Sequence, residues 1–252
     1  MIKNIILGIK EYSGVFGLIS KLKLWKYFFI PMIISLVTAI LIGVEAYALS
    51  DNVGSFISKA WIWEWGKETF TSISNFIGGA IVLIIGLILY KHIVMGLSAH
   101  FMSPVSEKIE KHFYGDVSYK HRNTSNTEQL IRGLRLNIRN LIKELLISLP
   151  ILLLKFIPIV NIFSTLLLFL VQAYYAGFGN IDYTIERHLK YKESIEFVSK
   201  NKGFAIGNGI VFMLFLLIPI VGIIIVLPLS VTAASTKTLK LIHGKTELVY
   251  EK

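Results

Sequence analysis

The hexapeptide IPIVNI occupies residues 157–162, and the nearly identical IPIVGI occupies residues 218–223. Each stands near the middle of a long apolar region, the first covering residues 145–176 and the second residues 204–234. Proline lacks a backbone donor and disfavours helix in the residue before it, whereas Asn and Gly tolerate the conformation that ends a helix. The repeated hexapeptide therefore predicts an interruption at the same point of both regions.

Such an interruption divides each region into two pieces of about 13 to 15 residues, each roughly 20 Å long as a helix. A piece of this length is shorter than the ~30 Å hydrocarbon core of a bilayer. Two interrupted apolar segments in matching positions are typical of broken helices in an internal repeat. Two interpretations are open: a kinked helix that crosses the membrane once at each place, or a hairpin that enters the membrane and returns.

The composition is typical of an integral membrane protein. Its 252 residues are 54% hydrophobic and 17% charged, whereas soluble domains are about 25% charged. Residues 27–49 and 73–102 form two further apolar regions, each long enough as a helix to cross the hydrocarbon core. These features exclude a disordered chain and predict an all-α integral membrane protein with a single membrane domain. There is no Cys, which excludes disulfides and Cys-ligated metals.

The distribution of basic residues favours the hairpins, because Lys and Arg concentrate in cytoplasmic segments. Five Lys precede residue 27, nine Lys and Arg lie within 91–143, five lie within 177–203, and four follow residue 236. If the two interrupted regions each crossed once, the 177–203 connection would lie outside the cell. With hairpins, every basic segment shares one side. We therefore expect two crossing helices, two pairs of half-penetrating (re-entrant) helices, and cytoplasmic N- and C-termini. The net charge of +10 then reflects this topology and not nucleic-acid binding.

Residues 103–144 form a polar segment on the cytoplasmic side or at the membrane interface. Ser103-Pro104 has the residue types of a helix start, and an amphipathic helical pattern begins at Leu130. Two interpretations of its basic face are open. The cations meet lipid headgroups, or they form a vestibule that concentrates anions at a pore mouth. The vestibule candidates are Arg132, Arg135, Arg139 and Lys143.

Three residues near the interruptions are candidates for anion binding. Lys155 precedes the first turn and would lie deep in a hairpin, where a cation is costly and marks function; the alternative is that its long side chain reaches the interface. Asn161 and Gly222 begin the returning helices. Unpaired N–H groups at those helix starts would suit an anion.

The sequence carries no pattern for catalysis or for metal binding. None of the six His residues is paired with another at i,i+3 or i,i+4 spacing, and nucleotide-binding and hydrolase motifs are absent. We expect no metal, no cofactor and no enzymatic activity.

Several short motifs, in a fixed order, resemble one known family. They are Leu18-Ile19-Ser20 with Pro31, Ser103-Pro104, the stretch from Phe156-Ile157-Pro158 through Asp182-Tyr183, Leu217-Ile218-Pro219, and Val231-Thr232-Ala233-Ala234. Over about residues 8–244 the chain resembles the CysZ-type sulfate permeases, which belong with the etoposide-induced membrane proteins. The resemblance implies two long crossing helices with two pairs of half-penetrating helices, oligomeric assembly, and ATP-independent, channel-like sulfate uptake across the bacterial inner membrane.

The resemblance also implies an anion site before the first crossing helix. In sulfate-handling members a Gly-Leu-Arg-Arg-like turn binds the anion, and the matching residues are Lys23-Leu24-Trp25-Lys26. Lys does not reproduce the fork of Arg. The candidate cations are therefore Lys21, Lys23 and Lys26, and the expected partners are lipid, a small inorganic anion and further copies of the chain. The alternative is a non-transporting membrane scaffold or stress-related protein of the same fold.

Overall fold

The computed structural model describes residues 1–115, 125–154, 157, 160–218 and 221–244. Nine α-helices and no strand occur in these parts of the chain. Their bounds are α1 Ile2–Lys10, α2 Val15–Lys21, α3 Trp25–Ser58, α4 Lys67–Tyr114, α5 Asn126–Leu153, α6 Val160–Ile185, α7 Tyr191–Lys200, α8 Lys202–Leu216 and α9 Val221–Ile242.

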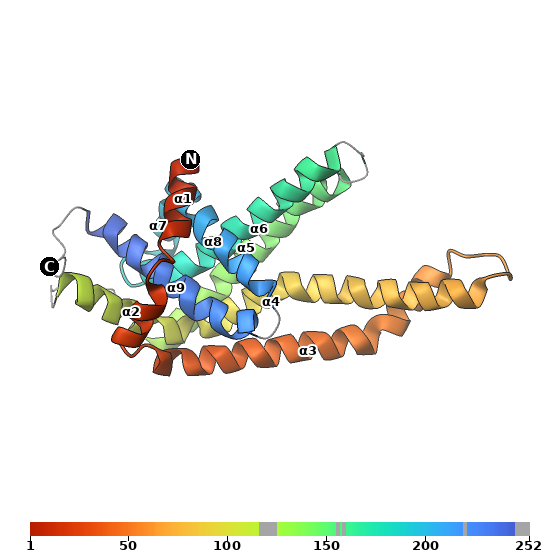
Figure 1. The fold of residues 1–252 in the computed structure, drawn as a ribbon, viewed down its shortest axis with the longest axis horizontal. Helices are drawn as coiled ribbons and strands as arrows, with labels where there is room; N and C mark the ends of the chain where they lie inside the picture. The colour runs from red at the N-terminus through yellow and green to blue at the C-terminus, as the bar shows by residue number, and fades with distance from the viewer. Residues whose placement is uncertain (116–124, 155–156, 158–159, 219–220, 245–252) are drawn as a thin grey trace.

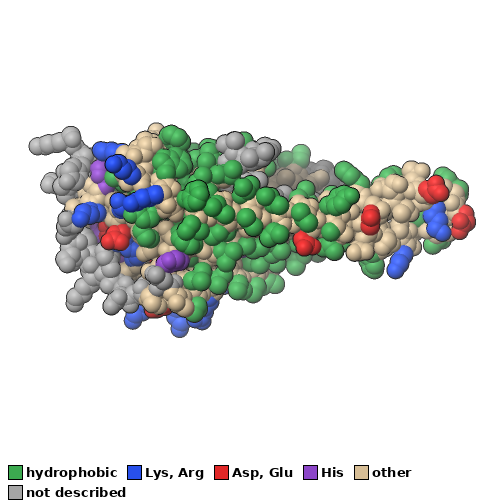
Figure 2. All heavy atoms as spheres, turned by 90° about the horizontal axis from the view of Figure 1, so that it is seen from below, with side chains coloured by type: hydrophobic (Ala, Val, Ile, Leu, Met, Phe, Trp, Pro, Cys, Tyr) green, Lys and Arg blue, Asp and Glu red, His purple; other side chains and the backbone are tan. Residues whose placement is uncertain are grey.

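Four of the described helices are long and apolar enough to cross a membrane: α3, α4, α6 and the 224–242 part of α9. On the face drawn in Figure 2, hydrophobic side chains cover the middle of the molecule, and Lys and Arg side chains gather at one end. The opposite end is the turn between α3 and α4, which form a long antiparallel pair (Figure 1). The chain is thus an all-α, multi-pass membrane protein, as the composition predicts.

The two crossing helices are longer than the apolar regions that predict them. α3 has 34 residues and α4 has 48, which correspond to roughly 51 Å and 72 Å. Both therefore exceed the ~30 Å hydrocarbon core. Hydropathy marks the part of a helix that suits lipid, but it does not mark where the backbone hydrogen bonding stops.

Helix α4 also shows that the prediction of a helix start at Ser103-Pro104 is wrong. The helix continues through Pro104 to Tyr114. An internal proline costs about 3 kcal/mol, but Met102, Val105 and Ile109 beside it are fully buried. Burying each such side chain contributes about 1.5–3 kcal/mol, so packing outweighs the local preference.

Each hexapeptide does end a helix. α5 ends at Leu153 and α6 begins at Val160, while α8 ends at Leu216 and α9 begins at Val221. The expected piece length is wrong for three of the four, because α5, α6 and α9 have 28, 26 and 22 residues and continue into the polar segments. Only α8, with 15 residues, matches it. In Figure 1 α5 and α6 lie side by side, joined at the end that points away from both termini.

Small residues bring α6 and α8 into close contact. Ala173 and Gly177 of α6 face Ala205 and Gly209 of α8. A Cβ atom on Gly177 would overlap the carbonyl oxygen of Ala205, and one on Gly209 would overlap that of Ala173. The same four-residue spacing on both helices is the small-xxx-small pattern that lets membrane helices approach closely.

Helix α5 places its polar face toward the protein and its apolar face outward. Ile131, Ile138 and Ile142 are 52–60% exposed, whereas Arg132 and Glu144 are buried. A water-soluble protein shows the opposite arrangement. In a membrane protein lipid satisfies the apolar face, and ionisable groups turn to the interior of the bundle.

Candidate functional site

The turn between α2 and α3 has a left-handed residue at its centre. Lys23 has a φ angle of 52° and is the one non-glycine residue with positive φ in the described ranges. Its N–H donates to the carbonyl of Ser20 (3.1 Å), and the Leu24 N–H donates to the carbonyl of Ile19 (2.9 Å). This is a Schellman helix end, and the hydrophobic contact that accompanies it is supplied by Ile19 and Leu24, both fully buried.

Three exposed cations lie on this anchored turn: Lys21, Lys23 and Lys26. A fourth cation approaches from α4, since the ammonium groups of Lys26 and Lys108 lie 5.1 and 5.6 Å from the centre of the Tyr27 ring. We call Lys21, Lys23, Lys26 and Lys108 the cationic turn cluster. The sequence did not predict Lys108, because no local pattern relates it to a turn some eighty residues earlier in the chain.

Arg132 does not join the basic face that the sequence predicts for it. Its guanidinium binds Asp182 through two hydrogen bonds of 2.8 and 3.0 Å, and also donates to Glu186 (3.3 Å) and Ser194 (2.6 Å). The side chain is 8% exposed. Arg132 therefore joins α5 to the end of α6 and to α7, and its role as a vestibule cation stays a prediction.

The other three vestibule candidates lie nearer the surface. Arg135 lies over the ring of Tyr191 (4.7 Å) and Arg139 lies over the ring of Phe178 (5.6 Å), while Lys143 is exposed. A vestibule requires cations near the surface, and these three residues lie there. Their role as a vestibule stays a prediction.

Glu186 lies just beyond α6 and titrates unusually. Burial raises the pKa of Glu186 to about 8, and the neighbouring Asp182 carboxylate adds to the shift, while Arg132 opposes it. The folded protein therefore holds a proton on this carboxyl near neutral pH. The network around Arg132 thus contains a carboxyl whose pKa lies near neutral pH.

The three anion-binding candidates near the hexapeptides differ in their surroundings. Lys155 lies outside the described residues. Asn161 is exposed near the start of α6, but its N–H donates to the Ile157 carbonyl (3.0 Å), and the Gly222 N–H donates to the Ile218 carbonyl (3.1 Å). Gly222 is also buried, and a Cβ there would overlap the Phe215 carbonyl oxygen. The expectation of unpaired N–H groups at these two residues is therefore wrong, and their role in anion binding stays a prediction.

An ion cluster that the sequence did not predict lies inside the bundle. The Lys91 Nζ atom lies 2.6 Å from Glu144 Oε1 and donates to the Gln172 carbonyl (3.3 Å), and His92 Nε2 lies 2.9 Å from Glu144 Oε2. Lys91 and Glu144 are each 2% exposed. The signal was present, because Lys91-His92 interrupts the second apolar region, and Glu144 is the one acid between Gln129 and Asp182. Ionisable residues within crossing segments mark functional sites.

Two hollows lie beside these helices. A groove of about 550 Å³ between α3 and α4 is lined almost wholly by apolar residues and carries one charged group, Glu45. Its lining suits lipid tails and not an anion. A smaller hollow of about 120 Å³ is lined by His92 and Asn137 among apolar side chains, at the edge of the Lys91–Glu144 cluster.

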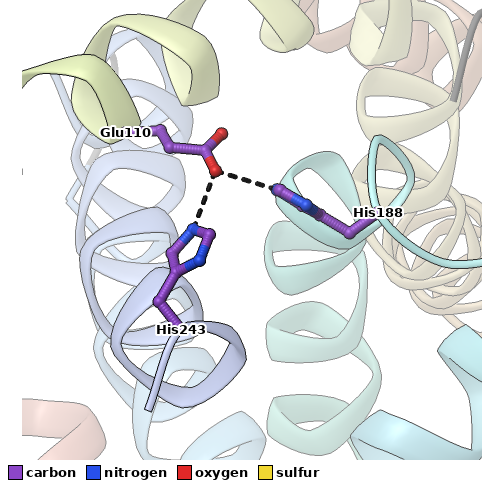
Figure 3. A group of neighbouring side chains, drawn as sticks. All are labelled: Glu110, His188 and His243. Atoms are coloured by element: carbon purple, nitrogen blue, oxygen red, sulfur yellow. Dashed lines mark hydrogen bonds and ion pairs between the residues drawn. The ribbon is translucent and has the colours of Figure 1, made fainter. Parts of the chain in front are cut away.

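A further group forms at the ends of three helices, and it is drawn in Figure 3. Glu110 of α4, His188 just after α6 and His243 just after α9 direct one ligand atom each toward a common point, with no two of these atoms more than 4.8 Å apart. Local His spacing predicts no metal site, because these three residues come from distant parts of the sequence. The structure assembles a ligand set that only the fold reveals.

A comparison with known families fits this architecture. The family described as sulfate transporter CysZ/etoposide-induced protein 2.4 matches residues 12–226. The chain belongs to the sulfate transporter CysZ/etoposide-induced protein 2.4 family. The match includes the cationic turn cluster, the Lys91–Glu144 cluster and both hexapeptides, and it confirms the resemblance that the motifs indicate. This family is one of membrane transporters and not of enzymes. No curated protein matches the chain.

Proposed function

We propose that the chain is an ATP-independent permease for a small inorganic anion of the sulfate class. The observation that carries the proposal is the backbone of Lys23. Its φ of 52° is a conformation that suits glycine, and Lys23 stands where the resemblance places the Gly of the anion-binding turn. A backbone conformation that suits glycine thus occurs in this chain at the position where the resemblance places a glycine.

The charge of the turn supports the same function. Four ammonium groups in the cationic turn cluster replace the two guanidinium groups that the resemblance implies. Lys acts as a point charge and not as a fork, so the cluster attracts a small anion through its field more than through fixed hydrogen bonds. A cluster of one sign raises the local concentration of its counter-ion.

The exposed apolar surface supports an oligomer in a bilayer. Leu153, Ile162 and Phe163, near the joined ends of α5 and α6, are 67–78% exposed. A hairpin that stops inside the membrane needs protein around its turn, because backbone groups cannot be left unpaired in lipid. We propose a homo-oligomer in the bacterial inner membrane, with both termini in the cytoplasm.

Uptake of radiolabelled sulfate into proteoliposomes tests the transport proposal, with chloride and selenite as competitors. We expect flux above that of protein-free liposomes, and a loss of about tenfold when Lys23→Gln and Lys26→Gln are combined. Lys192→Gln with Lys200→Gln is the matched control, since it removes two exposed cations from α7. A wild-type protein without flux would instead favour the scaffold alternative, and equal flux in both double variants would exclude the turn as the site.

The topology proposal has a direct test because the chain lacks Cys. We expect a single Cys at position 192 to resist a membrane-impermeant thiol reagent applied to intact cells, and one at position 63, in the loop between α3 and α4, to react. Reaction at position 192 would show that the interrupted regions cross the membrane. Lys155→Met in the flux assay tests whether Lys155 takes part in transport, and unchanged flux would exclude that role.

A further inference from the structure

The group formed by Glu110, His188 and His243 has the chemistry of a metal site. Glu110 Oε1 lies 2.8 Å from His243 Nε2 and 3.5 Å from His188 Nε2. The three side chains are 0–7% exposed. Two imidazole nitrogens and one carboxylate oxygen therefore meet in a space from which water is largely excluded.

The distances suit a first-row divalent ion. Zn²⁺ binds His nitrogen and carboxylate oxygen at about 2.0–2.2 Å, so tetrahedral ligand atoms stand roughly 3.3 Å apart. The two separations from Glu110 Oε1, 2.8 and 3.5 Å, lie on either side of this value. Imidazole ligands favour Zn, Cu, Fe and Ni over Mg and Ca.

Neighbouring side chains help to orient two of the three ligands, Glu110 and His243. Arg187 donates to the second oxygen of Glu110 (2.8 Å) and to Ser106 (3.2 Å), which directs Oε1 toward the two histidines. The ring of Tyr114 packs against that of His243, with centroids 4.5 Å apart. Partners that hold a ligand in place in this way are typical of metal centres.

The local charge also accommodates a cation. Arg187 is positive, but the Glu107 carboxylate acts on it electrostatically in addition to that of Glu110. An ion bound here would lie among carboxylates that already offset the guanidinium. Because hydrogen bonds from His243 and Arg187 to Glu110 could hold the group together alone, the experiment must separate a metal site from an ion-paired cluster.

We propose that Glu110, His188 and His243 bind one divalent transition-metal ion of the Zn²⁺ type. The ion joins the end of α4 to the segments that follow α6 and α9, on the basic side of the molecule. It serves the architecture, and neither the proposal nor its test depends on transport.

The test uses the full-length protein purified in detergent without a polyhistidine tag, treated with a chelator and then titrated with Zn²⁺. We expect one ion per chain and a rise of roughly 5 °C or more in the unfolding temperature. His188→Gln with His243→Gln weakens binding by about 100-fold or more. His100→Gln, a histidine of α4 outside the group, is the matched control and binds as the wild type does.

Cobalt gives a second readout that needs no destabilised variant. Co²⁺ in the wild-type protein produces visible absorption bands, and added Zn²⁺ removes them by displacement. Absence of stoichiometric binding to the wild type would overturn the proposal and leave an ion-paired cluster. Equal binding by the double variant and by His100→Gln would overturn it as well, because the metal would then lie elsewhere.

Discussion

The ammonium group of Lys91 lies 2.6 Å from a carboxylate oxygen of Glu144, and each side chain is 2% exposed. The two residues belong to α4 and α5 and are separated by 53 positions. Neither charge has access to water, so each depends on the other for its stability. The pair therefore fixes the placement of α5 against α4 more strictly than apolar packing alone.

Removing one member of this pair should destabilise the protein strongly. Glu144→Gln leaves the buried Lys91 ammonium without its counter-charge, and Lys91→Met leaves Glu144 with His92 alone. Each variant costs about 3–5 kcal/mol. The double variant should recover much of that loss. Thermal unfolding in detergent at a fixed scan rate measures all three. The matched control is Lys200→Met, which breaks an exposed pair with Glu196 and should change stability by less than about 1 kcal/mol. Additive losses in the double variant would contradict the coupling.

The α6–α8 contact should not tolerate a methyl group. Gly177→Ala and Gly209→Ala each place a Cβ into a carbonyl oxygen of the facing helix, and overpacking of this kind costs about 1–3 kcal/mol. Gly43→Ala is the control, since a Cβ there meets nothing within 4 Å, and it should be neutral or stabilising by up to about 1 kcal/mol. Unfolding temperatures test the contrast, and equal effects at all three positions would refute close packing.

Lys23→Gly should separate the shape of the cationic turn from its charge. Glycine removes the left-handed strain of about 1–2 kcal/mol and should raise the unfolding temperature, while anion flux falls because one cation is lost. Lys23→Ala loses the same charge and keeps the strain, so it should lower flux without stabilising the fold. A stabilised Gly variant with undiminished flux would show that the cation at this position takes no part in transport.

Stability should fall as the pH rises through the titration of Glu186. Its pKa is raised to about 8 from an ordinary value of 4.5, so the folded state binds a proton that the unfolded state has released between these values. The resulting stabilisation is complete below about pH 4.5 and is lost as pH approaches and passes 8. Glu186→Gln should flatten the dependence of unfolding temperature on pH over this range, whereas Glu64→Gln, with a carboxyl that is 94% exposed, should not.

The sequence predicted the elements whose signals are local. The apolar lengths predicted α3 and α4 as crossing helices, and the repeated Pro-Ile-Val predicted the breaks between α5 and α6 and between α8 and α9. The continuation of α4 through Pro104 could not be predicted, because side chains from other helices bury its surroundings. The helix ends that lie in polar segments were not predicted either. Hydropathy shows which residues suit lipid or water, but it does not show where the backbone hydrogen bonds of a helix end.

The polar sites were harder to predict because their members are far apart in the chain. Helical spacing placed Arg132 with Arg135 and Arg139, but only the fold brings Asp182 within 3 Å of it. The same holds for Lys91 with Glu144 and for Glu110 with His243. The spacing of charged residues in the sequence predicted on which face of a helix each one lies. The residue with which it pairs depends on which helices are neighbours in the fold.

The two buried charges of α5 differ in when their partners are synthesised. Arg132 and Glu144 of α5 meet their counter-charges on α6 and α4, respectively. When α5 leaves the ribosome, α4 is already complete but α6 has not been synthesised. Glu144 can pair at once with Lys91, whereas Arg132 must wait for Asp182 at the far end of the following helix. The final placement of α5 therefore depends on the helix that follows it, because Arg132 gains its counter-charge only once α6 has formed.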